Sequence, residues 1–171
     1  MATTYTLIAS NTLSSSAASV TFSAIPNTFT DLVLKISARS NEPGVSQTSI
    51  YFKPNLGTVN SETRLLGNGS TVSSGRNASN STSVLYYESQ PAATATANTF
   101  NNMEIYIPSY TAAQNKPTGG FAAQETNNAT AYISTVAGLT RSTTAISSIT
   151  IESIGSFVSG SSFFLYGIKN S

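Results

Sequence analysis

The chain lacks histidine, cysteine and tryptophan, and it has one aspartate, Asp31. Without histidine, a Ser-His-Asp arrangement with its base near neutral pH is excluded. Without histidine and cysteine, a tetrahedral zinc site, a disulfide and thiol chemistry are excluded as well. One aspartate cannot supply a calcium-binding loop, and no phosphate-binding glycine loop occurs. We therefore expect no metal site and no cofactor.

Six glutamates remain as candidate catalytic groups. Two carboxylates facing each other across a cleft could hydrolyse a glycosidic bond. However, Glu88, Glu104 and Glu152 lie in strand-like segments with apolar neighbours, where a charged side chain ordinarily points outward. We interpret them as solvated or paired across strands. The sequence therefore predicts no catalytic residue and no enzymatic activity.

Charged residues are also scarce, at 9% of the chain, against about 25% in an ordinary domain. The eight basic and seven acidic residues give a net charge of +1, and the basic ones are spread along the chain. The concentrated basic face of a nucleic-acid-binding protein is absent. No apolar run could span a bilayer, and we expect neither a signal peptide nor a membrane partner. Such low charge is typical of a protein that is either hydrated by hydroxyl groups or assembled.

Alternating apolar and polar residues indicate β-strands along most of the chain. In Asp31–Ser40 every second residue from Leu32 to Ala38 is apolar, and residues 103–107 alternate in the same way, as in strands with one buried face. Weaker signals, from β-branched or aromatic enrichment, follow in Tyr5–Ala9, Ser19–Ser23, Ser49–Lys53, Glu62–Leu66, Ser83–Glu88, Gly120–Gln124, Ala131–Val136, Ser147–Ile151 and Ser162–Ile168. No segment keeps apolar residues at helical spacing over three turns.

Many short strands without intervening helices predict an all-β fold. We expect an antiparallel β-sandwich, jelly-roll-like, with about 8–11 strands, because a parallel sheet would need helical crossovers. A chain of 171 residues fits a single domain, 1–171. Residues Gly67–Ser83 stand apart because Val72 is their only sizeable apolar side chain. We predict a flexible loop at 67–83, either without a specific task or ordered only against a neighbouring subunit or target.

Tyrosines are the candidate contact residues. Tyr106 faces away from the apolar side of its predicted strand, Tyr110 lies just beyond that strand, and the adjacent Tyr86 and Tyr87 point to opposite faces. An outward tyrosine offers a flat ring and a hydroxyl to a sugar, or an aromatic contact to a subunit. With Arg76 from the predicted loop, we take Tyr86, Tyr106 and Tyr110 as a candidate interface or ligand surface.

Both ends of the chain carry a family resemblance. The opening TLIASNTLSSSAASVTFSAIPNTFTDLVLKISARS and the closing SSFFLYGIKNS resemble those of small virion proteins of tailed bacteriophages, many from phages of cyanobacteria and other aquatic bacteria. The resemblance covers roughly Tyr5–Ser40 and Ser162–Ser171. It consists of strand and turn residues and contains no chemical motif, so it transfers no functional residue.

The resemblance implies a β-sandwich component of a virus particle, assembled in the host cytoplasm. The leading hypothesis is a capsid decoration, or cement, protein on the capsid surface. Such a protein is expected to form a homotrimer, to bind the major capsid protein and to stabilise the particle through contacts repeated by symmetry. The alternative is a receptor- or carbohydrate-binding module of a tail fibre or spike, with a host-surface glycan as its ligand.

Overall fold

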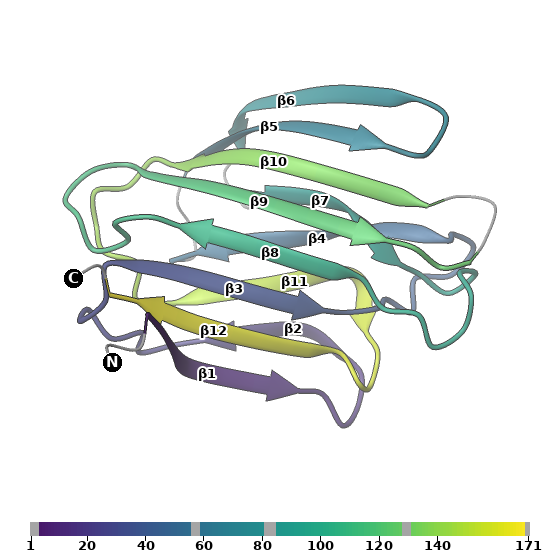
Figure 1. The fold of residues 1–171 in the computed structure, drawn as a ribbon, viewed down its shortest axis with the longest axis horizontal. Coiled ribbons are helices and arrows are strands. Elements are labelled where there is room, and N and C mark those ends of the chain that lie inside the picture. Colours follow the sequence, from purple (N-terminus) through teal and green to yellow (C-terminus); the bar gives the residue numbers. More distant parts are fainter. Residues whose placement is uncertain (1–3, 56–58, 81–84, 128–130, 170–171) are drawn as a thin grey trace.

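The computed structural model describes residues 4–55, 59–80, 85–127 and 131–169, and these residues form two antiparallel sheets without a helix (Figure 1). The large sheet has eight strands in the order β1-β12-β3-β8-β9-β10-β5-β6, and the small sheet has four in the order β2-β11-β4-β7. The strands are β1 (Tyr5–Thr12), β2 (Ala17–Phe22), β3 (Asp31–Ser37), β4 (Gln47–Pro54), β5 (Asn60–Gly67), β6 (Val72–Asn80), β7 (Leu85–Pro91), β8 (Asn102–Ile107), β9 (Lys116–Gln124), β10 (Tyr132–Thr140), β11 (Ile149–Phe157) and β12 (Ser162–Ile168).

The all-β antiparallel sandwich predicted from the sequence is confirmed. The chain changes sheet at every step from β1 to β5, and again from β6 to β7, β7 to β8, β10 to β11 and β11 to β12. β5 and β6 form one antiparallel pair and β9 and β10 another, and together they extend the large sheet beyond β8. The large sheet is therefore wider than the small one.

The core lies between the two sheets. Leu32, Leu34 and Ile36 of β3 are buried, whereas Lys35 between them is exposed, as the alternation predicts. Further core side chains come from both sheets, among them Ile50, Phe52, Met103, Ile105, Ile149, Ile151 and Leu165. The rings of Phe157 and Phe163 meet edge to face with their centroids 4.9 Å apart.

The prediction of a loop over 67–83 is wrong for Val72–Asn80, which form the edge strand β6. β6 pairs along the length of β5, from Val72 opposite Gly67 to Asn80 opposite Asn60. The prediction failed because it required buried apolar side chains. An edge strand can instead be held by backbone hydrogen bonds to one neighbour while its side chains stay in solvent, as Val72 does at 76% exposure. Residues 81–83 lie outside the described residues.

The small sheet covers only part of the inner face of the large one. β7 packs against β9, β10 and β5, whereas β6 packs mainly on β5. Residues 72–78 of β6 are all exposed or half-buried. The edge strand β6 thus extends past the small sheet, where the molecule is a single layer (Figure 1).

Candidate functional site

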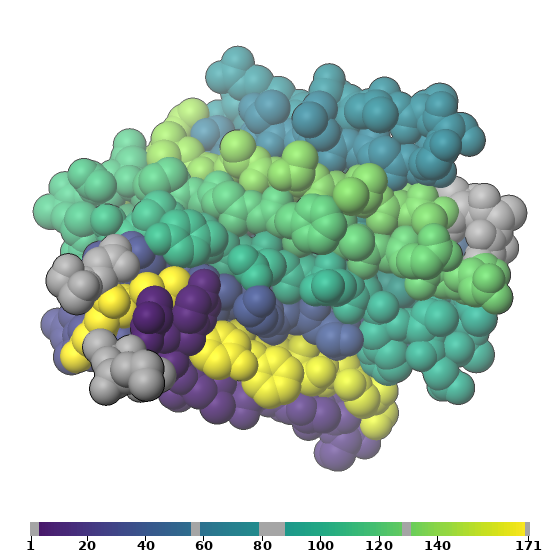
Figure 2. All heavy atoms as spheres, in the orientation of Figure 1, coloured from purple at the N-terminus to yellow at the C-terminus, as the bar shows by residue number. Residues whose placement is uncertain are grey.

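The side chains of the large sheet that point away from the small sheet form an outer face, on which no described strand packs. Figure 2 shows this face, with the teal β5 and β6 at one end, the green β10 and β9 beside them, and the yellow β12 and purple β1 at the other end. Strand alternation decides which residues reach this face.

Four large apolar side chains gather on the half of the outer face formed by β5, β6, β9 and β10. We call them the apolar patch: Leu65, Val72, Phe121 and Ile133. Their exposed fractions range from 41% to 76%, and they surround a depression of about 280 Å³. Contiguous exposed apolar side chains rimmed by polar residues are typical of an interaction surface.

The depression continues along β5 and β10 toward a cationic end. Two further hollows follow it, the last lined by Thr63, Arg76 and Ala137 among others. Arg76 is exposed and makes no ion pair with any residue that the structure describes. The groove is therefore apolar at one end and positively charged at the other.

Tyrosines occupy the other half of the outer face. Tyr5 and Tyr166 meet edge to face with ring centroids 6.3 Å apart, and Leu7 beside them is 51% exposed. Tyr106 is 39% exposed, and its hydroxyl donates a hydrogen bond of 2.6 Å to Oδ2 of Asp31. This bond, with a smaller contribution from burial, raises the pKa of Tyr106 to about 12. We call Tyr5, Leu7, Tyr106 and Tyr166 the tyrosine cluster.

The structure places the candidate contact residues predicted from the sequence in different environments. Tyr106 and Arg76 both lie on the outer face, on β8 and β6. Tyr110 is fully buried, its hydroxyl donates to the carbonyl oxygen of Pro26, and burial raises its pKa. The prediction of a surface role for Tyr110 is wrong because the turn after β8 ends the strand alternation. The side chain of Tyr86 lies outside the described residues.

The sequence reasoning missed the apolar patch because it took apolar residues in strands as core residues. A signal for the patch exists in the spacing of those residues. Leu65 and Leu66 are adjacent in one strand, so they point to opposite faces. Ile133 and Val136 are three residues apart and also face opposite ways, and Ile133 is 52% exposed whereas Val136 is 3% exposed.

Two of the strand glutamates are paired with lysines, as predicted. Glu104 lies directly opposite Lys35 on the neighbouring strand, with 2.6 Å between Oε2 and Nζ. Glu152 on β11 pairs with Lys53 on β4. Both pairs are partly exposed, so each contributes little to stability.

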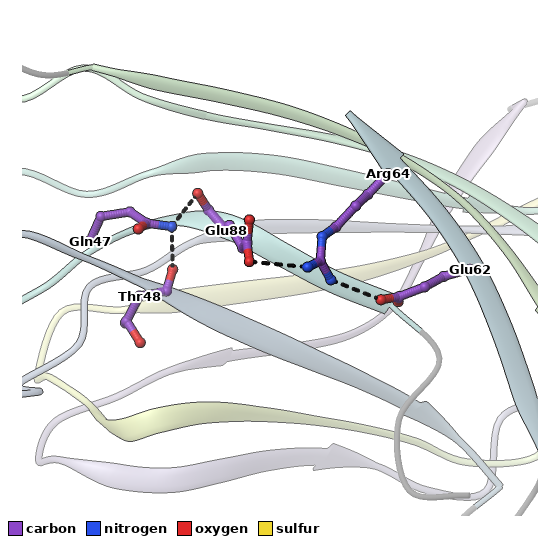
Figure 3. Close-up of polar contacts among 5 residues, drawn as sticks. All are labelled: Gln47, Thr48, Glu62, Arg64 and Glu88. Atoms are coloured by element: carbon purple, nitrogen blue, oxygen red, sulfur yellow. Dashed lines mark hydrogen bonds and ion pairs between the residues drawn. The ribbon is translucent and has the colours of Figure 1, made fainter. Parts of the chain in front are cut away.

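Arg64 pairs with two glutamates and, through one of them, joins the two sheets (Figure 3). Its Nη1 lies 3.2 Å from Oε1 of Glu62 on the same strand, and its Nη2 lies 3.5 Å from Oε1 of Glu88 on β7. The side chain of Glu62 is 3% exposed. One guanidinium thus engages both carboxylates, which is the arrangement of an electrostatic clamp between β5 and β7.

Arg39 is a buried cation that holds a connection between strands. The residue is 8% exposed, and its guanidinium donates to the carbonyl oxygens of Thr96 at 2.7 Å, Ala92 at 2.8 Å and Ala95 at 3.0 Å. Burial lowers the pKa of Arg39. The guanidinium fork therefore organises the segment between β7 and β8.

Lys116 plays a similar part at the other end of the sandwich. The residue is fully buried, and its Nζ donates to the carbonyl oxygens of Ala112 at 2.6 Å, Gln114 at 2.5 Å and Ser142 at 3.3 Å. Burial lowers the pKa of Lys116. Because its described contacts are backbone carbonyls, the lysine ties together the turns that precede β9 and follow β10.

No group of histidine, cysteine, aspartate and glutamate in the described part of the chain could hold a metal ion. No helix long and apolar enough to cross a membrane occurs among the described residues. No protein-family model, no curated protein and no solved structure matches the chain. The function is therefore argued from the surface itself.

Proposed function

We propose that the chain is a structural protein of a virus particle, a decoration protein that binds the outer capsid surface and stabilises the particle. The observation that carries this proposal is the outer face of the large sheet. Beside the apolar patch this face exposes Tyr5 and Leu7, at 50% and 51%. A surface of this kind binds through area and shape complementarity. The resemblance of both ends of the chain to phage virion proteins supplies the setting in which such a surface is covered.

The strand order supports the same proposal. We interpret β1-β12-β3-β8 facing β2-β11-β4-β7 as a jelly roll, with β5, β6, β9 and β10 added to one of its sheets. Jelly rolls occur in viral capsid proteins and in lectins. A fold hosts many functions, so the surface carries more weight than the topology.

We assign attachment to the major capsid protein to Tyr5, Leu7 and Tyr166 of the tyrosine cluster. Aromatic side chains are enriched in protein interfaces because they bury a large area and keep one polar group for orientation. A single such contact is modest, but a capsid presents the same site many times, and linked copies bind with much higher avidity. The net charge of +1 means that attachment depends only weakly on salt.

An add-back experiment tests the proposal. Particles of the phage that encodes the chain are dialysed until they lose it, then heated with or without the purified chain while a dye reports DNA release. We expect the added chain to raise the temperature of release. Leu7→Asp places a charge in the tyrosine cluster and should abolish this effect, whereas Val45→Asp, a similarly exposed residue between β3 and β4, should preserve it. An unchanged release temperature with the wild-type chain would overturn the proposal.

A carbohydrate-binding module of a tail fibre or spike is the second candidate. The exposed rings of Tyr5 and Tyr106 on the same half of the face favour it, because flat rings stack on sugars. Copy number separates the two candidates: a decoration protein is present in hundreds of copies per particle, and a fibre tip in a few tens at most. A saturable ligand on a glycan array would favour the second candidate.

A further inference from the structure

We infer that the apolar patch joins two copies of this chain, with their large sheets packed face to face about a twofold axis that runs along β10. The inference depends on the arrangement of the outer face and does not depend on where the protein is located. It commits the patch to one occupant, a second copy of the same chain. The partner surface is then the same face of a second copy, rotated by half a turn.

The register of the sheet places the outward side chains in rows across five strands, from β8 through β9, β10 and β5 to β6. The first row contains Tyr106, Gly119, Ala137, Thr63 and Arg76. The second row contains Glu104, Phe121, Thr135, Leu65 and Ser74. The third row contains Asn102, Ala123, Ile133, Gly67 and Val72. In each row β10 supplies the central residue.

A half-turn about β10 exchanges β5 with β9 and β6 with β8, and it keeps each row at its own level. In the second row, Leu65 and Phe121 flank Thr135, so each faces the other residue in the partner copy. In the third row, Ile133 lies on the axis and faces its own counterpart. Leu65, Phe121 and Ile133 of one copy therefore meet apolar side chains of the other, as a self-complementary interface requires, whereas Val72 at the margin faces Asn102.

The first row is complementary in charge. The same half-turn places the guanidinium of Arg76 against the ring of Tyr106 in the partner copy. Arginine over a tyrosine face is a favourable cation–π contact, and the carboxylate of Asp31 behind this ring adds to the attraction. Between them Thr63 faces Gly119, which has no side chain to obstruct the approach. Arg76, which has no ion-pair partner among the described residues, gains a cation–π partner across the axis.

An axis laid across the strands at the level of Thr135 gives a worse match. It exchanges the first row with the third and places Val72 against Arg76, an apolar side chain against a charge. The strand-parallel axis keeps the third row, with its apolar Ile133 and Val72, away from the charged end. The geometry therefore favours one of the two simple ways in which these faces can pair.

The area that the two faces bury can be compared with the area of known interfaces. Five strands at about 4.8 Å spacing and three rows about 7 Å apart, with their margins, give about 500 Å² per copy. The total of about 1,000 Å² is at the lower limit for a specific interface. We therefore expect a weak dimer, which a net charge of +1 opposes only slightly. A twofold contact implies an even number of copies in place of the three expected from the sequence.

Cysteine cross-linking tests the axis directly because the chain contains no cysteine of its own. Ile133→Cys lies on the axis, so a short bismaleimide should link this variant to itself. Ser74→Cys should not link to itself, since the two positions lie four strand spacings, about 19 Å, apart across the axis. Mixed with Glu104→Cys, which faces it in the second row, Ser74→Cys should form a linked heterodimer. Linking of Ser74→Cys to itself without linking of the mixture would overturn the proposed axis.

Sedimentation equilibrium supplies the second measurement. We expect the wild-type chain to dimerise reversibly, Ile133→Asp to raise the dissociation constant at least tenfold, and Val45→Asp and Leu7→Asp to leave it unchanged. Circular dichroism confirms that each variant is folded. A wild-type chain that stays monomeric at high concentration, or that forms trimers, would overturn the inference. A dimer that does not attach to particles would instead leave it standing and reject the proposed virion function.

Discussion

Tyr106 and Asp31 lie on neighbouring strands of the large sheet, and the tyrosine hydroxyl donates to the aspartate carboxylate at 2.6 Å. The other carboxylate oxygen of Asp31 accepts a hydrogen bond of 2.8 Å from the backbone N–H of Ser109. The one aspartate of the chain therefore ties β3 to β8 and to the turn that follows β8. It also holds the ring of Tyr106 in the orientation that both the tyrosine cluster and the inferred dimer use.

This pair predicts a loss of stability at high pH. The hydrogen bond favours the neutral phenol, so the pKa of Tyr106 rises from an ordinary value of 10.0 to about 12 in the folded chain. The stability it contributes is complete below pH 10 and is lost as the pH rises through about 12. We expect the free energy of unfolding to fall more steeply over this range in the wild type than in Tyr106→Phe, as measured by urea denaturation at a series of pH values. Equal slopes would contradict the assignment.

The buried guanidinium of Arg39 predicts a large effect of a conservative substitution. Arg39→Lys should lower the free energy of unfolding by about 2–4 kcal/mol, because a lysine cannot reach the separate carbonyl oxygens that the fork engages. Arg141→Lys is the matched control, since Arg141 is exposed and donates to one described carbonyl oxygen, that of Ala78 at 2.8 Å. Its effect should stay within about 0.5 kcal/mol. Urea denaturation of both variants checks the difference, and equal effects would contradict the role of Arg39.

The buried ion pair within β5 predicts coupling between Arg64 and Glu62. Arg64→Gln should lower the free energy of unfolding by about 2–4 kcal/mol, because it removes a cation from a carboxylate that is almost fully buried. Glu62→Gln in the same chain should recover part of this loss. A double-mutant cycle measures the coupling, and strictly additive effects would show that the two side chains act independently.

Gly167 predicts a steric effect in β12. A Cβ at this position would lie 2.3 Å from Cγ of Phe29, so Gly167→Ala forces the ring to move and should cost about 1–3 kcal/mol. Gly119→Ala is the control, because a Cβ there meets nothing within 4 Å, and it should be neutral or slightly stabilising. Thermal unfolding of the two variants side by side tests the prediction. Equal melting temperatures would contradict it.

The sequence predicted the strands that carry a buried apolar face and missed the one that does not. Ser162–Ile168 coincides with β12, and Asp31–Ser40 contains β3, which ends three residues earlier at Ser37. β6 was missed because backbone pairing to β5 leaves no mark in the hydrophobic pattern. Alternation of apolar and polar residues therefore predicts strands that have one buried face, and it misses an edge strand whose side chains stay in solvent.

The sequence could predict only those residues of the candidate site that lie inside a strand, where alternation fixes the direction of the side chain. Tyr106 lies inside a strand, so its outward direction followed from its neighbours, whereas Tyr110 lies beyond a turn and its direction did not. The buried roles of Arg39 and Lys116 could not be predicted either. Their described partners are chiefly backbone carbonyls, which every sequence contains, and the fold alone decides which of them converge.

The unequal width of the two sheets has a consequence for how the molecule opens. β6 has a strand neighbour on one side and packs mainly on β5, so its amide hydrogens should exchange with solvent first. Protection should then rise inward through β5 and β10 to β9 and β8, which lie in the centre of the large sheet. β6 can thus loosen while the two-layer scaffold stays intact, because the ion pair of Arg64 with Glu88 holds β5 to β7. Evolution can therefore vary β6 with little effect on the rest of the fold.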